Sequence, residues 1–457
     1  MMKRLTKAKG IVASVGAVAM LLSMAGCGNG SSEASGDDDK ELNISWYYAS
    51  DGGDTFTRVI DQFKKENPDI KVTETHTSFP QMQKNGQLIM QGDDAPDVVQ
   101  YNQGTSSVGN LASQGILADL SDYASQYGWD KKIPSSMQTI AKFKADENGI
   151  MSPEGQWYGV PLQGEYTLAY YNKDLFEKNG IEIPKTFDEL ESAMQKFVDK
   201  GITPVAFEGS ETAAQHLWYE LALSKADRDW VNKYQSYSGA VDWNSEPFTY
   251  AANTLDSWVK NGYIPSNSGG LVAEDMITQF CAGKYPIMFS GSWWFGRVNQ
   301  DGKFKSEFAT FPGNEKLSTA GSGKLWVVPE KSKHKAAAAK FLDFALGEET
   351  QNMLGTEAGL PVDTSIDPDL SAVPTLMKNP NKTFDNIQDK VKEMNSVFQT
   401  LLKNDAIAYY PDWPSAGMYD SLNSALQGII NQKSTPEKAT AEIKAAYEEG
   451  KADLGIE

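Results

Sequence analysis

Two short segments hold the aromatic and acidic side chains best suited to bind a ligand. Trp293 and Trp294 follow a short apolar run, and residues 409–414 (YYPDWP) set Asp412 and Trp413 between two prolines. Flat rings pack against apolar faces of a ligand, and carboxylates accept hydrogen bonds from hydroxyl groups. The prolines stiffen the second segment, which lowers the entropy lost on binding. Both segments therefore predict contacts with a small ligand.

The recognised catalytic and metal-binding motifs are absent from the sequence. It contains no Walker-type phosphate loop, no HExxH and no GxSxG. Its three histidines, His76, His216 and His334, lie among unrelated neighbours, and two cysteines cannot build a cysteine-ligated cluster or a disulfide framework. The net charge of −19 argues against a nucleic-acid-binding surface, which would be basic. We therefore predict no metal and no cofactor.

The chain from residue 42 alternates strand and helix patterns. Apolar residues between Phe56 and Phe63 recur at helical spacing. The patterns predict, in order, strand 42–48, helix 56–63, strand 70–72, helix 82–90 and strand 97–101. This βαβαβ order implies a mostly parallel sheet whose carboxyl-end loops face a ligand. Asp51 after the first strand and Asn102 after the third are predicted ligand contacts, although either could simply form a tight turn.

A second set of strand and helix patterns begins near Tyr158. The segment 186–189 (TFDE) has the form of a capping box and begins a helix. Further elements are predicted at helix 248–259, strand 287–289, a strand and helix unit over 325–328 and 335–346, and a helix beginning near residue 435. With 457 residues, 40% of them hydrophobic, the chain is predicted to be an α/β protein of two or more domains.

The N-terminus has the form of a secretory signal. Four basic residues precede an apolar run, 11–25, that is too short and too rich in small residues for a membrane span. Met24-Ala25-Gly26-Cys27 then resembles the lipobox of bacterial lipoproteins, with Met where Leu is usual. Residues 1–26 are therefore predicted to be a signal peptide, and Cys27 to be acylated. An ordinary signal peptide with an incidental cysteine is the alternative.

The residues after Cys27 predict a flexible, acidic linker. Residues 28–40 (GNGSSEASGDDDK) are small and polar and contain no side chain suited to a core. Removing residues 1–26 takes away four basic and no acidic residues, so the net charge falls from −19 to −23. A surface this acidic does not bind an anionic bilayer, which makes a covalent lipid anchor useful. Cys281 then has no disulfide partner, and its apolar setting predicts a buried, inert thiol.

Collinear motifs run through nearly all of the chain beyond the linker. They are WYGVP at 157–161, YYNKDLF at 170–176, GI at 180–181, PKTFDEL at 184–190, FCAGKYPIM at 280–288, GSW at 291–293, GSG at 321–323, LWVV at 325–328, the helix 336–346 with Gln351, and GLPV at 359–362. In this order, behind a lipobox, they resemble the extracellular solute-binding proteins of the sugar-specific, maltose-binding-protein-like family that serve ABC importers.

The resemblance implies a periplasmic-binding-protein-like fold, in which two α/β lobes close over a ligand by hinge motion. By analogy, residues 41–159 and 306–360 form the first lobe, and residues 160–305 and 361–457 form the second. The implied partners are a mono- or oligosaccharide and the membrane permease subunits of an ABC importer. The protein is then a monomer, lipid-anchored to the outer face of the cytoplasmic membrane, most simply that of a Gram-positive bacterium.

Sugar recognition needs aromatic platforms for the C–H faces of a pyranose and polar side chains for its hydroxyl rim. Loop position, aromatic content and the resemblance together select the predicted ligand contacts: Asp51, Asn102, Glu165, Tyr166, Trp218, Ser292, Trp293, Trp294, Arg297, Asp412 and Trp413. Glu165 and Tyr166 are included because they follow the predicted hinge at Val160-Pro161.

Several of these residues also have a purely structural interpretation. One ring of the 293–294 pair, or the Trp413 ring, could fill a core instead. Trp218 could pack within a helix, where aromatic residues are more often buried. Arg297 could form a surface salt bridge, and Glu165 could be a solvated charge in a turn.

Two other functions fit parts of the sequence. A secreted glycoside hydrolase also uses a tryptophan-lined cleft, with two carboxyl groups about 5–10 Å apart and one raised pKa. The same fold could instead hold a polyamine or a peptide. The lipobox, the linker and the family resemblance favour a binding protein over an enzyme, and the aromatic loops favour a neutral sugar over a cation.

Overall fold

The computed structural model describes residues 40–47, 55–314, 316–356 and 359–456, which belong to one compact unit. The predicted signal peptide, the lipidation site Cys27, most of the predicted linker and the predicted ligand contact Asp51 lie outside the described residues. None of the helices in the described part combines the length and apolar character that a membrane crossing requires.

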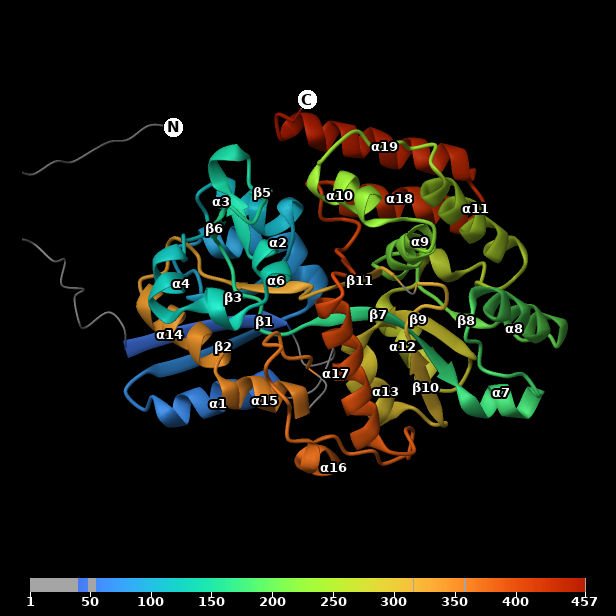
Figure 1. Ribbon diagram of the computed structural model, residues 1–457, viewed down its shortest axis with the longest axis horizontal. Coiled ribbons are helices and arrows are strands. Elements are labelled where there is room, and N and C mark those ends of the chain that lie inside the picture. The colour runs from blue at the N-terminus through green and yellow to red at the C-terminus, as the bar shows by residue number, and fades with distance from the viewer. Residues whose placement is uncertain (1–39, 48–54, 315, 357–358, 457) are drawn as a thin grey trace, which may run out of the picture. The chain divides into compact units, whose positions relative to one another are not determined.

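A four-stranded sheet forms the first lobe, with the strand order β12-β3-β1-β2 (Figure 1). β1 (Glu41–Tyr47) pairs in parallel with both β2 (Lys71–Thr77) and β3 (Val98–Asn102). The helices α1 (Thr55–Glu66) and α2 (Phe79–Gln91) connect these strands. The predicted βαβαβ unit is therefore confirmed, and the helical spacing predicted for α1 gives that helix one buried side.

The fourth strand of this sheet, β12 (Lys324–Val327), runs antiparallel to β3. Lys324 pairs with Asn102, so the chain enters the sheet at the carboxyl end of β3 and must run in the opposite direction. The strand and helix predicted over 325–346 are present, but they do not extend the parallel part of the sheet as another βα unit would. α14 (Lys335–Ala345) and α15 (Glu348–Thr356) follow and pack against α1.

A six-stranded sheet forms the second lobe. Its central strand β7 (Glu165–Asn172) is buried along its whole length. The strands β9 (Ile287–Gly291), β10 (Ser306–Ala309) and β11 (Ser318–Gly321) all pair antiparallel with β7. Two short strands, β8 (Val205–Ala206) and β13 (Ile407–Ala408), pair in parallel with β9 and β11. This sheet is therefore mixed, whereas the sequence pattern suggested a second set of units like those of the first sheet.

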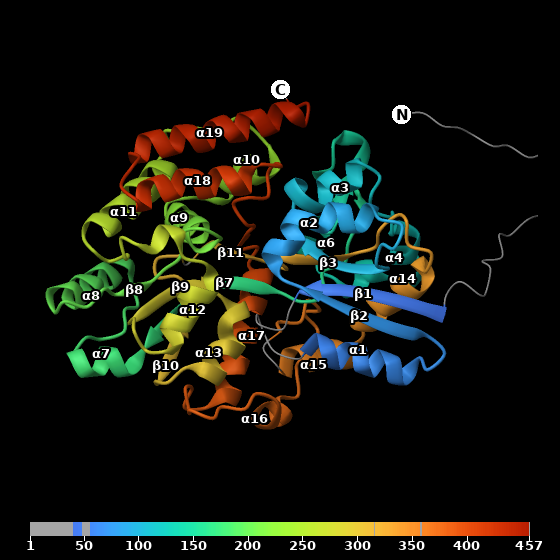
Figure 2. The ribbon, with the colours of Figure 1, turned by 180° about the vertical axis from the view of Figure 1, so that it is seen from behind.

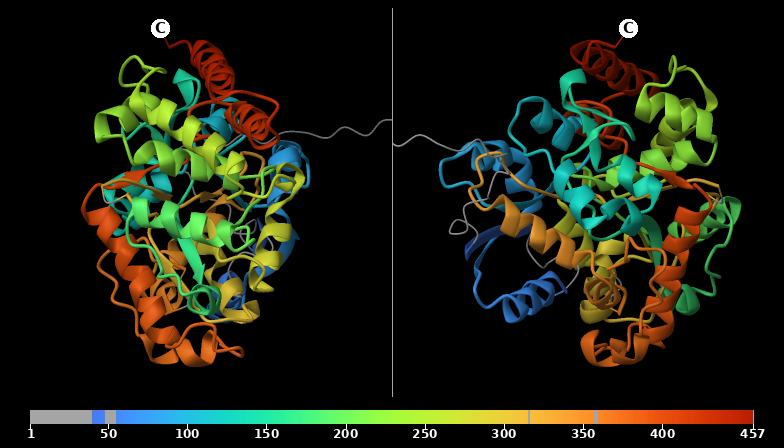
Figure 3. Two further views of the ribbon diagram at one scale, coloured as in Figure 1. Left: turned by 90° about the vertical axis from the view of Figure 1, so that its right-hand side faces the viewer. Right: turned by 60° about the vertical axis from the view of Figure 1, so that its left-hand side comes forward.

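Helices cover the second sheet. α9 (Ala213–Leu223), α11 (Glu246–Lys260), α18 (Met418–Ile430) and α19 (Pro436–Asp453) pack on one another to one side of it (Figure 2). Figure 3 shows the red C-terminal helices beside the yellow-green segment that contains α10 (Arg228–Ser236) and α11. The capping box predicted at Thr186 is formed and begins α8 (Phe187–Asp199).

The remaining elements are shorter or lie at the edges of the lobes. They are the helices α3 (Asn110–Ser113), α4 (Ser121–Tyr127), α5 (Trp129–Lys132), α6 (Ser135–Thr139), α7 (Lys173–Asn179), α8 (Phe187–Asp199), α10 (Arg228–Ser236), α12 (Ala273–Cys281), α13 (Phe295–Asp301), α16 (Val373–Leu376) and α17 (Ile387–Lys403), and a small sheet of β4 (Lys142–Lys144), β5 (Ile150–Met151) and β6 (Gln156–Trp157).

Segments that connect the two sheets lie side by side. Val160 and Trp326 exchange two backbone hydrogen bonds of 2.9 and 3.0 Å. The buried Gln351 side chain donates to the carbonyl of Leu162 and accepts from the N–H of Val362, each at 2.9 Å. The Gln351 amide thus links the segment at Leu162 to the segment at Val362.

The strand pairing differs from the expected lobe division at residue 306. Residues 306–309 and 318–321 both pair with β7, so they belong to the sheet of the second lobe. The Phe308 ring packs edge-on against Phe295 and Phe384 and holds this segment there. The chain therefore rejoins the first sheet only at Lys324, and the boundaries expected after residues 159 and 360 stay predictions.

Candidate functional site

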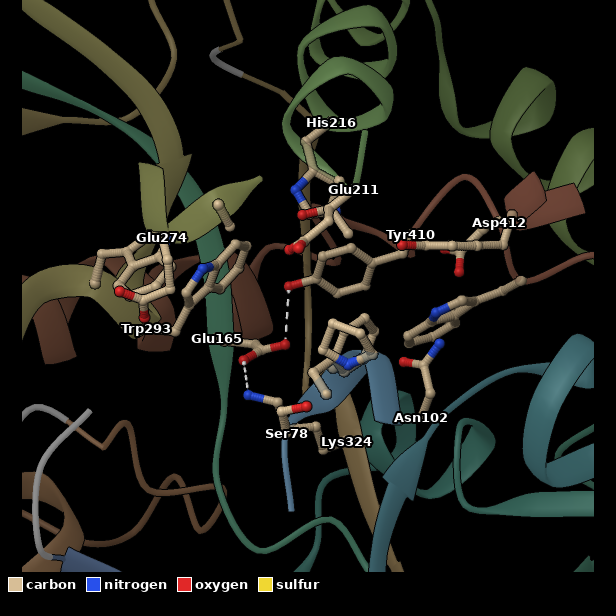
Figure 4. A pocket seen from close by; sticks show the side chains of 18 residues that line it. Ser78, Asn102, Glu165, Glu211, His216, Glu274, Trp293, Lys324, Tyr410 and Asp412 are labelled. Carbon is tan, nitrogen blue, oxygen red and sulfur yellow. Dashed lines mark hydrogen bonds and ion pairs between the residues drawn. The ribbon is translucent and has the colours of Figure 1, made fainter. Parts of the chain in front are cut away.

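A pocket of about 260 Å³ lies between the two lobes (Figure 4). The start of α2 and the carboxyl end of β3 contribute from the first lobe, and α9, α12 and the loops after β9 and β13 contribute from the second. Its lining residues are Ser78, Phe79, Pro80, Asn102, Glu165, Glu211, Thr212, His216, Ala273, Glu274, Trp293, Trp294, Gly323, Lys324, Tyr410, Asp412, Trp413 and Tyr419. The carboxyl end of a parallel strand is where such sheets bind ligands.

Aromatic rings form a continuous wall in this pocket. Trp293 meets His216 edge-on at a centroid distance of 5.6 Å, and His216 lies 5.2 Å from Tyr410. Tyr410 lies 5.3 Å from Trp413, which stacks on Tyr409 at 5.5 Å. Rigid rings lose little conformational entropy on binding. The wall can therefore pack against the C–H face of a ring-shaped ligand.

Two glycines let the tryptophan rings approach the backbone. Gly104 has a φ of +86°, and a Cβ at this position would lie 2.5 Å from Cβ of Trp413. Gly291 lies under the Trp293 ring, and a Cβ there would be 1.9 Å from the nearest ring carbon. Trp413 is 2% exposed, whereas Trp293 is only half-buried. Trp293 is therefore the more accessible of the two platforms.

Glu165 lies in a buried polar cluster at the start of β7. Its Oε1 accepts a hydrogen bond of 3.3 Å from the Tyr410 hydroxyl, and its Oε2 lies 3.6 Å from Nζ of Lys324 (Figure 4). Gly323 has a φ of +67°, and a Cβ there would lie 1.2 Å from the same Oε1. The cluster therefore depends on glycine at position 323. It also joins Glu165 of the second lobe to Lys324, the residue at which β12 of the first lobe begins.

Asp412 is a second buried carboxylate, 8% exposed. Burial raises the pKa of Asp412 to about 6, against smaller opposing effects from its own backbone N–H and from a hydrogen bond with the Asn102 side chain. Asn102 ends β3 in the first lobe, whereas Asp412 follows β13 in the second. These two predicted ligand contacts therefore meet across the pocket.

The N-terminal end of α9 supplies pocket residues that the sequence analysis did not select. The buried Glu208 carboxylate accepts backbone N–H groups of Ser210, Glu211 and Thr212 at 2.9, 2.7 and 2.8 Å, which holds the loop before α9 in place. His216 follows on the first turns of this helix. Burial lowers the pKa of His216 to about 3, so its ring is neutral, and its Nδ1 has no hydrogen-bond partner among the described residues.

The pocket brings together six of the predicted contacts: Asn102, Glu165, Trp293, Trp294, Asp412 and Trp413. Tyr166 does not line it, because successive residues of a strand point to opposite faces. While Glu165 faces the pocket, the Tyr166 hydroxyl contacts Sδ of Met394 at 2.9 Å within the core. Ser292 also lies behind the pocket, where its hydroxyl accepts the N–H of Tyr166.

Trp218 and Arg297 are likewise outside the pocket lining. His216 faces the pocket, and Trp218 lies more than half a turn further around α9, so it points away from the pocket. There it is fully buried and stacks against Phe248. Arg297 forms ion pairs with Asp301 and with Glu274, the second at 3.6 Å. This arrangement matches the salt bridge that was the structural interpretation of Arg297.

Signals for the other missed residues were weak in the sequence. Tyr410 stands in the YYPDWP segment, and Lys324 follows the GSG turn, so both were within segments already singled out. Ser78 and Glu274 have no distinctive local pattern, because they enter the pocket only through the placement of α2 and α12. Within the described residues, no group of three or more His, Cys, Asp or Glu side chains is arranged to hold a metal ion.

Two α/β lobes joined by adjacent crossing segments, with an aromatic and acidic pocket between them, define a solute-binding protein. The family model of bacterial extracellular solute-binding proteins matches residues 49–352, and the chain belongs to this family. The family resemblance and the two-lobe fold inferred from the sequence are thereby confirmed.

Curated relatives and solved structures agree with this assignment. The chain is 26% identical over 354 residues to a multiple sugar-binding protein of Streptococcus mutans, covering 73% of this chain and 77% of the relative. It is 26% identical to a maltooligosaccharide ABC transporter solute-binding lipoprotein of Streptococcus pneumoniae, covering 71% of each chain.

Among solved structures, a chitin oligosaccharide binding protein superposes with a TM-score of 0.71 at 20% identity, covering 90% of this chain and 100% of that one. A maltose-bound protein of T. maritima superposes with a TM-score of 0.68, also at 20% identity, covering 89% and 99%. At such identities the likeness shows the fold.

Proposed function

We propose that this protein is the substrate-binding component of an ABC importer, which captures a sugar in the pocket between its lobes and delivers it to a membrane permease. The observation that carries the proposal is the combination of an aromatic wall with buried carboxylates in one pocket. The wall suits the C–H faces of a pyranose, and Glu165, Asp412 and Asn102 suit its hydroxyls. The names of the relatives, which include sugar and maltooligosaccharide binding, support the same ligand class.

The pocket also suggests how ligand binding closes the lobes. A ligand shifts an open–closed equilibrium only through its differential affinity for the two states. A sugar that touches Trp293 of the second lobe gains contacts with Asn102 and Ser78 of the first lobe only when the lobes come together. The volume of about 260 Å³ lies just below the range of roughly 300–1,000 Å³ for ligand pockets. It suits a mono- or disaccharide, or the end of a longer chain.

A thermal-shift screen against mono- and oligosaccharides tests this function. A ligand that binds the folded state raises the melting temperature by mass action. We expect at least one sugar to raise it, and Trp293→Ala to reduce the shift without unfolding the ligand-free protein. Absence of a shift with every sugar, together with a shift from an amino acid or peptide panel, would contradict sugar binding.

We further propose that the pocket binds without catalysis. Glu165 and Asp412 are carboxyl groups of the kind a glycoside hydrolase needs, so the two functions require a direct test. Incubation with the sugar that shifts the melting temperature is expected to give stoichiometric binding and no new product by chromatography. Product release that Glu165→Gln abolishes would identify an enzyme instead.

The anchor is a separate proposal, which rests on the lipobox-like segment at Cys27. We propose that acylated Cys27 holds a monomeric protein at the outer face of the cytoplasmic membrane. Cys27→Ala should move the protein from the membrane fraction to the supernatant of a bacterial host. Cys281→Ala removes the buried thiol and should leave the membrane association unchanged.

A further inference from the structure

The Asp412 carboxylate is buried in the lining of the pocket, and no cationic side chain among the described residues forms an ion pair with it. The groups that act on it are its own backbone N–H and the Asn102 side chain, and its charge helps to raise the pKa of the Tyr234, Tyr410 and Tyr419 hydroxyls. Lys324 is the only cationic residue among the lining residues that the structure describes, and it pairs with Glu165. A buried charge is normally paired, so Asp412 is placed to receive its partner from a ligand.

The other charged residues of the pocket add to the negative potential. Glu211 and Glu274 also line it, and the nearby Arg297 is held by Asp301 and Glu274. His216 stays neutral through burial, and its Nδ1, in a residue 92% buried, has no hydrogen-bond partner among the described residues. His216 therefore places in the same pocket lining a buried ring nitrogen that no described protein group satisfies.

We propose, building on the proposed sugar-binding function, that Asp412 with Trp413, Tyr410 and Tyr419 forms a subsite for a positively charged amino group, so that the preferred ligand is an amino sugar. A carboxylate and aromatic faces around one cavity are the two features that attract an ammonium group. A neutral sugar donates only hydroxyl hydrogen bonds to Asp412. An acidic sugar brings a second negative charge close to Asp412 and is repelled.

Matched sugars that differ in one substituent test this subsite. Glucose, glucosamine and glucuronic acid share one ring, and the N-acetylated and deacetylated chitin disaccharides share another. Calorimetry near neutral pH should show each amine binding about tenfold more tightly than its neutral counterpart, with the acid weakest. Asp412→Asn should abolish this preference. Asp93→Asn, which removes the same charge from a side chain 98% exposed and outside the pocket, should keep it.

Proton release provides an independent readout. At about pH 6, where Asp412 is half protonated, binding of an amine favours the ionised carboxylate and releases protons. Titrations in two buffers of different ionisation enthalpy should therefore give different heats for glucosamine and equal heats for glucose.

Two outcomes would overturn the inference in different ways. If neutral sugars bind as tightly as their amines, or if Asp412→Asn keeps the preference, the subsite is absent while the sugar-binding function stands. If spermidine binds and no sugar does, the pocket recognises cations without recognising sugars, and the proposed function itself falls.

Discussion

Gly323 is the position where a single added methyl group should disturb the pocket most. A Cβ at Gly323 would lie 1.2 Å from Oε1 of Glu165, and the residue has a φ of +67°, which L-residues avoid. The Glu165 carboxylate is held by the Tyr410 hydroxyl and by Lys324, so it can move only by leaving both partners. The space open to it is the pocket itself. Gly323→Ala should therefore weaken both folding and ligand binding.

The structure separates two contributions to this loss. The left-handed backbone conformation costs a non-glycine residue about 1–2 kcal/mol. Losing the hydrogen bond to an ionised carboxylate adds about 2–3 kcal/mol. Gly180→Ala provides the matched control, because Gly180 has a φ of +65° and no atom within 4 Å of an added Cβ. The control should lose only the backbone contribution.

Denaturant titration of both variants measures the free energy of unfolding, and calorimetry measures binding of the sugar found in the screen. We expect Gly323→Ala to lose about 3–5 kcal/mol of stability, and Gly180→Ala to bind sugar like the parent. If the two variants lose equal stability and bind equally well, the Glu165 cluster neither constrains position 323 nor contributes to the site.

Three further changes test other parts of the structure. Folding raises the pKa of Asp412 from 3.8 to about 6, so the folded state binds more protons between these pH values and its stability falls as pH rises through them. Asp412→Asn should remove this fall and raise the free energy of unfolding near neutral pH by roughly 2–3 kcal/mol. An unchanged dependence of the unfolding free energy on pH, measured by denaturant titration, would contradict this prediction. Trp293→Ala should weaken sugar binding, measured by calorimetry, about tenfold. Trp230→Ala removes a half-buried ring outside the pocket and should leave sugar binding unchanged. Equal losses of affinity in the two variants would argue against stacking of the sugar on Trp293. Burial raises the pKa of the Cys281 thiol to about 12, so iodoacetamide should label it by mass spectrometry only after unfolding, and rapid labelling of the native protein would show that the thiol is accessible.

Local sequence patterns determined the elements and the family. The helical spacing of α1 and the capping box of α8 depend on residues three or four positions apart, so they can be recognised without any distant partner. The motifs from Trp157 to Val362 likewise identified the solute-binding family that the family model confirms. The 293–294 segment was selected because its large rings follow a buried strand, and the 409–414 segment because two prolines hold a ring and an acid between them.

Tertiary structure decided which side chains face the pocket. Glu165 and Tyr166 are neighbours in sequence, yet the strand directs them to opposite faces, and only the position of β7 shows which face is the pocket. On α9, which is buried on all sides, no amphipathic pattern separates His216 from Trp218. The charge balance around Asp412 also depends on long-range contacts, because Lys324, the one cation among the described lining residues, comes from a different segment and pairs with Glu165 instead. The periodicity of a sequence indicates which side of a single helix or strand is buried. A binding site forms where several elements pack together, and that packing is determined only in the folded chain.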